Sequence, residues 1–167
     1  EGHQNFLARI FGTTILNNFL ITIILFSSIF LFIPDLITHF SKNLEVCQGQ
    51  IDYIQVRSLG LVFTFISLSI NAYFMAIGKT KLVFINAIFI AVSNIGLDYL
   101  LINGNSEFPE LGLKGAALAS SIADAIGMLF LITALYFSKE QRAHSLFKNI
   151  SINKESFQQL FKISSPI

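Results

Sequence analysis

A carboxylate, an amide and a hydroxyl are spaced along the chain so that they could meet inside a bundle of helices. Asn94 and Asp98 lie four residues apart, which places both on one face of a helix, and Ser120 lies in the next apolar segment. Their oxygens are hard ligands of the kind that a small hard cation prefers. Burial of a carboxyl group favours its neutral form, so Asp98 could carry a proton instead. The three residues therefore predict a site for a small cation or a proton.

A second acid and two amides interrupt other apolar segments. Asp124 stands near the middle of the last of these segments. A carboxylate at mid-span costs about 2.5–3.5 kcal/mol on insertion scales, and such residues commonly mark ion or proton pathways. Asn18 and Asn71 each lie four residues from a hydroxyl residue on the same helix face. We regard Asp124, Asn18 and Asn71 as possible pathway residues, and interhelical hydrogen bonding, worth about 0.6 kcal/mol a contact, as the alternative.

Two segments without any charged side chain indicate which elements position these residues. They cover residues 10–34 and 58–78 and, at about 1.5 Å per residue, reach about 37 and 31 Å. Either is long enough to cross a hydrocarbon core of about 30 Å. Two further segments are apolar except for Asp98, Asp124 and a few amides and hydroxyls. The chain is therefore predicted to be an all-α, polytopic membrane protein with four transmembrane helices, at about 11–33, 57–78, 81–102 and 115–137.

The composition excludes several classes of protein. Hydrophobic residues make up 53% of the 167 residues, charged residues make up 13%, and the net charge is +1. These values exclude a disordered chain and a nucleic-acid binder with a strong basic field. The chain has no Walker loop, no HExxH or GxSxG motif and no cluster of Cys and His. We therefore expect no enzyme activity, no cofactor and no nucleic-acid partner, and we expect the lipid bilayer as the surrounding medium.

The basic residues outside the predicted spans indicate the orientation. With four spans, the two ends of the chain and the turn near residue 80 share one side of the membrane. That side carries eight basic residues, and the other side carries three, namely Lys42, Arg57 and Lys114. The positive-inside rule then predicts a plasma (inner) membrane protein with both ends of this segment in the cytoplasm.

Small residues recur at every fourth position of the last predicted span. The four residues of this ridge are Gly115, Ala119, Ala123 and Gly127. Such a ridge lets the backbone of a neighbouring helix come close. We therefore predict that the helix at about 115–137 packs tightly against the helix at about 81–102.

Residues 138–167 follow the last span and have a pattern of their own. Asn153 could cap a short helix in which Phe157, Leu160 and Phe161 share one face. The prediction is an amphipathic helix at the cytoplasmic surface, and a connector without membrane contact is the alternative. We therefore divide the chain into a transmembrane part, residues 1–137, and a cytoplasmic linker, residues 138–167, which ends where a further helix would start.

Three strings of residues resemble a known family. They are GKTK at 78–81, NIGLDYLLI at 94–102 and LGLKGAALAS at 111–120. In this order and spacing they resemble the multidrug and toxic compound extrusion (MATE) family of efflux transporters. The resemblance covers the whole chain: the four predicted spans are similar to family helices three to six, and residues 138–167 are similar to the linker that leads to helix seven.

The resemblance implies a fold, an activity and a role for the polar residues. The family has twelve helices in two lobes, and a central cavity that opens alternately to each face exports drugs or other small organic compounds in exchange for Na⁺ or H⁺. In some members an Asn and an Asp on helix five and a hydroxyl on helix six bind the cation. Asn94, Asp98 and Ser120 match these positions. An Asp on family helix one belongs to the same site and lies outside this chain, so the partners implied include the remainder of a longer chain.

Two other functions fit parts of the pattern. A lipid-linked sugar flippase of the same superfamily would tend to carry more Arg and Lys along its cavity. The interiors of the four predicted spans contain no basic residue, which favours a drug exporter. A non-transporting membrane subunit of four helices is the alternative from another class, and it predicts that the reading frame ends near Ile167.

Overall fold

Four helices make up nearly all of the chain that the structure describes. The computed structural model describes residues 2–40, 43–104 and 109–138. The helices are α1, Gly2–Phe40; α2, Leu44–Ala76; α3, Thr80–Ile102; and α4, Gly112–Phe137. The predicted amphipathic helix with Phe157, Leu160 and Phe161 lies outside the described residues, as does nearly all of the predicted linker 138–167.

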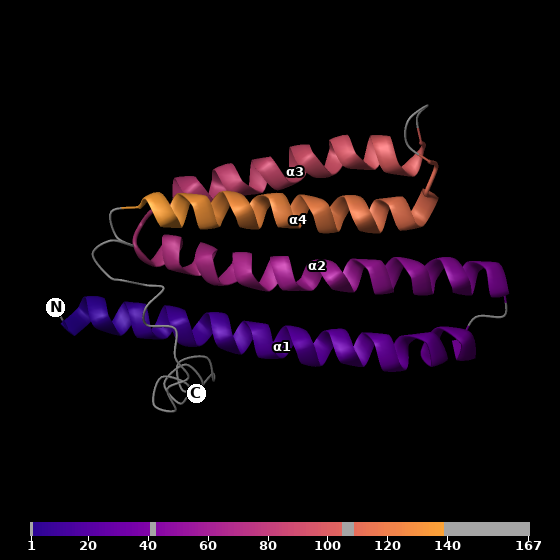
Figure 1. Ribbon diagram of the computed structural model, residues 1–167, viewed down its shortest axis with the longest axis horizontal. Helices are drawn as coiled ribbons and strands as arrows, with labels where there is room; N and C mark the ends of the chain where they lie inside the picture. The colour runs from indigo at the N-terminus through magenta and orange to yellow at the C-terminus, as the bar shows by residue number, and fades with distance from the viewer. Residues whose placement is uncertain (1, 41–42, 105–108, 139–167) are drawn as a thin grey trace.

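The helices lie side by side in the spatial order α3, α4, α2, α1 (Figure 1). In this order α3 and α4 are antiparallel, α4 and α2 are parallel, and α2 and α1 are antiparallel. Helix α4 returns between α3 and α2 and contacts both of them extensively, whereas α2 and α3 touch little. Helix α1 packs against α2 and lies at the edge of the group. Polar residues of α4 can therefore reach two helices, and this position of α4 organises the candidate site.

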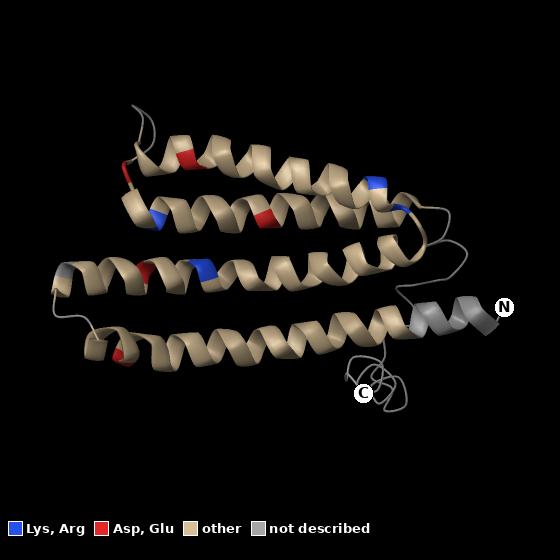
Figure 2. Ribbon diagram, turned by 180° about the vertical axis from the view of Figure 1, so that it is seen from behind, with Lys and Arg blue, Asp and Glu red and all other residues tan. Residues whose placement is uncertain are grey.

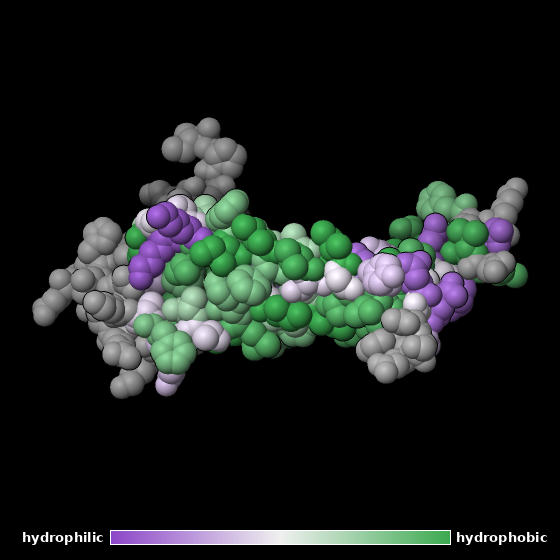
Figure 3. All heavy atoms as spheres, turned by 90° about the horizontal axis from the view of Figure 1, so that it is seen from above, coloured by the Kyte–Doolittle hydropathy of each residue, from purple (hydrophilic) through white to green (hydrophobic). Residues whose placement is uncertain are grey.

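All four helices are long and apolar enough to cross a membrane, over Ile10–Phe40, Val46–Ala76, Thr80–Ile102 and Gly112–Phe137. Large apolar side chains such as Leu31, Phe84 and Ile95 are 68–69% exposed. Apolar residues cover the middle of the face seen in Figure 3, and hydrophilic residues gather toward its two ends. Because a bilayer would solvate such a surface and water would not, the chain has the surface of a multi-pass membrane protein, as predicted.

Two helices extend well beyond the charge-free segments that predicted them. Helix α1 continues through Pro34 and Asp35 to Phe40 instead of ending near residue 33. Helix α2 begins at Leu44, thirteen residues before the predicted start near residue 57. The prediction was wrong there because a charged residue ends a charge-free segment without ending a helix. Helices α3 and α4 begin within three residues of their predicted positions.

One end of the bundle holds an apolar core. It is formed by buried side chains of α1, α2 and α4, namely Phe11, Ile70, Tyr73, Phe74, Leu131 and Leu135. At the same end a tight turn joins α2 to α3: Gly78 has φ +75°, and Lys79 N–H donates to Phe74 O at 2.8 Å. This is the hydrogen-bond pattern of a helix that ends on a left-handed glycine. The turn fixes where α3 starts.

The small-residue ridge of α4 packs against α3, as predicted. A Cβ atom at Gly115 would collide with the Leu101 carbonyl group, and one at Gly127 would collide with the Ile90 side chain. Between the two glycines, Ala119 and Ala123 have no exposed surface. Close approach of the two backbones is therefore possible only because these side chains are small, and it brings the polar residues of α3 within reach of α4.

Candidate functional site

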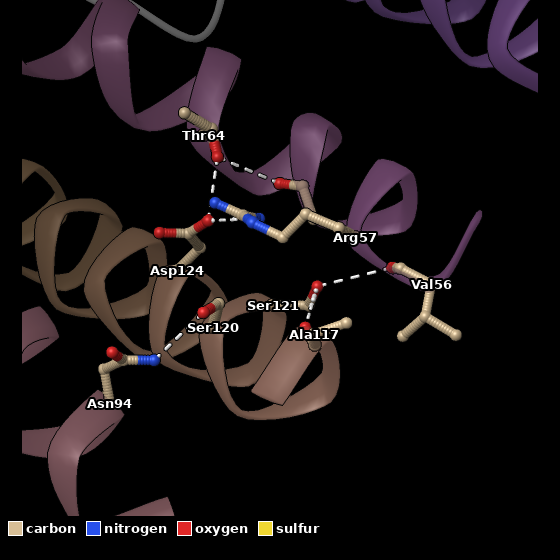
Figure 4. A network of polar contacts seen from close by, with 9 residues as sticks. Val56, Arg57, Thr64, Asn94, Ala117, Ser120, Ser121 and Asp124 are labelled. Carbon is tan, nitrogen blue, oxygen red and sulfur yellow. Dashed lines mark hydrogen bonds and ion pairs between the residues drawn. The ribbon is translucent and has the colours of Figure 1, made fainter. Parts of the chain in front are cut away.

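Asn94 links the two polar residues that the sequence paired with it. Its amide lies between Asp98, one turn further along α3, and Ser120 of α4, and Figure 4 shows it reaching toward Ser120. Figure 4 draws the amide nitrogen toward Ser120 Oγ, at 3.1 Å. With the amide turned over, its nitrogen donates to Asp98 Oδ2 at 3.2 Å and its oxygen accepts from Ser120 Oγ at 3.1 Å, so that both Asp98 and Ser120 are bonded. In this orientation the amide joins the side chains of Asp98 and Ser120.

The carboxyl group of Asp98 keeps one oxygen without a partner. Asp98 Oδ1 is buried and has no hydrogen-bond partner among the described residues. A buried acceptor without a hydrogen bond destabilises the folded protein unless an ion or a donor group binds it. The part of the chain that the structure describes holds no cluster of three His, Cys, Asp or Glu residues that could take a metal ion. A cation at this point would therefore be held by mixed oxygens, from Asp98, Asn94 and Ser120, as suits a small hard ion.

Asp124 forms an ion pair that links α4 to α2. Its Oδ2 lies 2.9 Å from Nη1 of Arg57 and also accepts a hydrogen bond from Thr64 Oγ1 at 2.9 Å (Figure 4). The side chain of Asp124 is 15% exposed and that of Arg57 is 33% exposed. Asp124 was predicted only as a possible pathway residue, and its cationic partner was not foreseen.

Arg57 corrects one argument made from the sequence. It was assigned to a loop, and the span interiors were said to contain no basic residue. In the structure Arg57 lies within Val46–Ala76, the part of α2 that is long and apolar enough to cross a membrane, and about 20 Å along the helix from its start. Figure 2 shows charged positions on α2 and α4 away from the helix ends. A cation at this depth is tolerated because an acid on the neighbouring helix compensates it.

Gly60 makes room for this ion pair. A Cβ atom at Gly60 would collide with Nη1 of Arg57 and would lie 2.8 Å from Ser121 Oγ. Ser121 itself is buried and bonds to the carbonyl group of Ala117 at 2.9 Å and of Val56 at 3.4 Å. The contact between α2 and α4 thus combines a glycine, a hydroxyl and an ion pair within two helical turns.

An open cavity of about 370 Å³ connects the two polar groups. Its polar lining residues are Arg57 from α2, Asn94 from α3, and Ser120 and Asp124 from α4. The rest of its wall is formed by Ala and Ile side chains of α3 and α4. The Asn94–Ser120 contact and the Arg57–Asp124 pair therefore face one common space.

The two amides named as possible pathway residues, Asn18 and Asn71, lie outside this cavity. Asn18 joins α1 to α2, because its amide donates to Ser69 Oγ at 2.8 Å and to the Phe65 carbonyl oxygen at 3.3 Å. Asn71 has a buried Oδ1 without a hydrogen-bond partner among the described residues, as does Asn86 on α3. None of these three amides lines the cavity that holds Arg57 and Asp124.

Comparison with known proteins gives a family and a set of relatives. The MatE family model matches residues 1–100, which is more than half of the chain and includes Arg57, Asn94 and Asp98. The probable multidrug resistance protein NorM of Streptococcus pneumoniae strain R6 is 24% identical over 147 residues, which cover 88% of this chain and 32% of that protein. Proteins with the same name from Listeria innocua and Bacillus anthracis are each 25% identical, over 122 and 116 residues, and this chain spans 27% and 26% of their lengths.

No solved structure matches the chain. The chain spans about a third of the length of the first of these curated relatives and about a quarter of the other two. What it resembles is therefore one part of a longer transporter.

Proposed function

The chain belongs to the MatE family, and from this premise we propose that it forms part of a secondary active transporter that exports drugs or other organic compounds in exchange for Na⁺ or H⁺. The names of the relatives support multidrug export as the activity. The orphaned Oδ1 of Asp98, beside Asn94 and Ser120, is the observation that supports coupling to a cation. The start of α1 and the end of α4 face the cytoplasm in this proposal, because the basic residues favour that side.

The geometry suggests how binding of an ion would reach the helix packing. In one orientation of the Asn94 amide, its nitrogen faces Asp98 and its oxygen faces Ser120. A cation at Asp98 favours an oxygen in place of that nitrogen, so the amide turns over. Ser120 then meets a donor where it met an acceptor, and its hydroxyl group accepts instead of donating. One ion thus reverses the polarity of a contact between α3 and α4, which can shift an equilibrium between two packings of these helices.

A lipid-linked sugar flippase is the second candidate, and the position of Arg57 is the observation that favours it. A guanidinium group inside the span is a group that could hold a phosphate. Arg57 is already paired with Asp124, however, so the two side chains add no net positive charge to the cavity. We therefore keep export of organic compounds as the proposed function.

The experiment uses the full-length transporter that contains this segment, reconstituted in vesicles with an imposed Na⁺ or H⁺ gradient. Asp98→Asn should abolish gradient-driven export of a fluorescent organic cation and leave the amount of folded protein unchanged. Asp35→Asn is the matched control, because Asp35 is an exposed carboxylate on α1. Export that is equal in both variants would contradict coupling at Asp98. Export of a labelled lipid-linked sugar instead of the organic cation would select the flippase.

A further inference from the structure

The cavity between α2, α3 and α4 presents a pair of opposite charges that the proposed ion site does not use. Arg57 and Asp124 meet through a single pair of atoms, Nη1 and Oδ2. Among the described residues, Thr64 is the one other polar partner of these two side chains, and it bonds to the same Oδ2. A guanidinium group has five N–H donors, and a carboxylate has two oxygens. The described residues therefore leave most of the N–H donors of Arg57 and one oxygen of Asp124 without a partner.

Charge balance decides which ligand this pair can accept. An anion alone would place two negative groups around one guanidinium, and a cation alone would place two positive groups around one carboxylate. Inside a membrane each uncompensated charge is costly. A ligand with one charge of each sign avoids both costs, because it adds no net charge.

We propose that the cavity binds a compact zwitterion whose ammonium and carboxylate groups are attached to the same carbon atom, as in an α-amino acid. The ligand's carboxylate accepts hydrogen bonds from the free N–H groups of Arg57, and its ammonium group donates to Oδ1 of Asp124. The four charges then alternate in sign around a small ring, and the Arg57–Asp124 contact is kept. Charge-assisted hydrogen bonds of this kind are the strong ones.

The remaining wall fits the apolar body of such a ligand. Ala87, Ile90, Ala91 and Ala123 line the cavity beside the charged pair. Its volume of about 370 Å³ lies within the range of small-molecule sites. The inference rests on the proposed function only in treating the bound zwitterion as a compound that the transporter exports. Binding itself requires no transport.

Binding is measured with the purified full-length transporter in detergent, by equilibrium dialysis. The probes are 3-(1-naphthyl)alanine, which is a fluorescent zwitterion, its methyl ester, which is a cation, and its N-acetyl derivative, which is an anion. The zwitterion should bind about tenfold more tightly than either derivative, because each derivative loses one charged contact. Equal binding of the three probes would overturn the proposal.

Two double variants separate the charged pair from a general effect of charge. Arg57→Gln with Asp124→Asn removes both charges, so that no unpaired charge remains. In this variant the affinities for the three probes should lie within about threefold of one another. Lys114→Gln with Asp52→Asn removes a second described ion pair between α4 and α2, which is more exposed, and it should keep the preference. Arg57→Lys, which retains the positive charge, should keep most of the preference for the zwitterion. A preference that survives loss of the Arg57–Asp124 pair would overturn the assignment to this cavity.

The outcome is independent of ion coupling. If Asp98→Asn abolishes export but the wild-type protein shows no preference for the zwitterion, this inference fails and the proposed function stands. If the preference is found and depends on Arg57 and Asp124, while no gradient drives export, the binding site stands and the proposed function fails.

Discussion

Ser120 and Asp124 stand one turn apart on α4 and contact different helices. Ser120 meets the Asn94 amide of α3 at 3.1 Å, and Asp124 meets the Arg57 guanidinium of α2 at 2.9 Å. Both contacts line the same cavity. Helix α4 therefore joins a candidate ion site on one side to a charged pair on the other, and changes at either contact should be separable by substituting single side chains.

Ser120 should contribute to cation affinity, and its neighbour Ser121 should not. Ser120→Ala removes a hydroxyl oxygen from the Asp98 group and should weaken the apparent affinity for the coupling ion about 3- to 10-fold, the value of one hydrogen bond. Ser120→Thr keeps the hydroxyl and should remain near the wild type. The measurement is the rate of export as a function of Na⁺ concentration or of pH.

Ser121→Ala is the control for this test, because Ser121 bonds to Val56 and Ala117 on the side of α4 that faces α2. An equal loss of affinity in both alanine variants would mean that the effect comes from the packing of α4. Wild-type affinity in Ser120→Ala would remove Ser120 from the site.

The Arg57–Asp124 pair should stabilise the fold mainly by keeping each charge compensated. Asp124→Asn leaves the Arg57 charge without a counter-charge in a partly buried place and should cost about 1–3 kcal/mol of unfolding free energy. Arg57→Gln combined with Asp124→Asn should cost less than that single change, because no orphaned charge remains. Thermal unfolding in detergent gives the comparison. Additive losses in the double variant would mean that the two side chains are not coupled.

The existence of four membrane-spanning helices could be predicted because apolar segments of more than twenty residues leave few alternatives. Helix ends could not be predicted from charge alone. A start of the second helix near residue 57 implies a connection of 23 residues, 34–56, without secondary structure, and a loop of that length is itself evidence against the assignment. That signal was present in the sequence and would have placed Arg57 inside a helix.

The polar groups of the site could be predicted in part. Spacing along one helix put Asn94 beside Asp98, and the reversal of direction between α3 and α4 put Ser120 at their depth. To predict the partner of Asp124, one must know that α4 lies between α3 and α2. No pattern within α4 alone shows that α2 is its second neighbouring helix. For Asn18 the sequence left open a pathway role or an interhelical hydrogen bond, and its amide does bond to α2.

The orientation of the bundle can be checked by labelling single cysteines. The background is a full-length transporter without cysteines, which includes Cys47→Ala. In it, Thr80→Cys lies at the start of α3 and Asn103→Cys lies just beyond its other end, and both positions are exposed. A membrane-impermeant maleimide added to intact cells should label Asn103→Cys and not Thr80→Cys, because the basic residues place the turn near residue 80 in the cytoplasm. The opposite labelling pattern would reverse the assigned topology.

Gly127 should be required for the close packing of α3 on α4, and Gly96 should not. A methyl group added by Gly127→Ala would collide with the Ile90 side chain and would lie 3.1 Å from Asn86 Oδ1. Relieving that overlap moves the helices apart and should cost about 1–3 kcal/mol of unfolding free energy. Gly96→Ala adds the same group on α3 where no atom lies within 4 Å, so it should be neutral or slightly stabilising. Ser120 reaches Asn94 only because the two helices approach closely, so Gly127→Ala should also lower the affinity for the coupling ion. An unchanged affinity in a destabilised variant would show that the site does not depend on this packing.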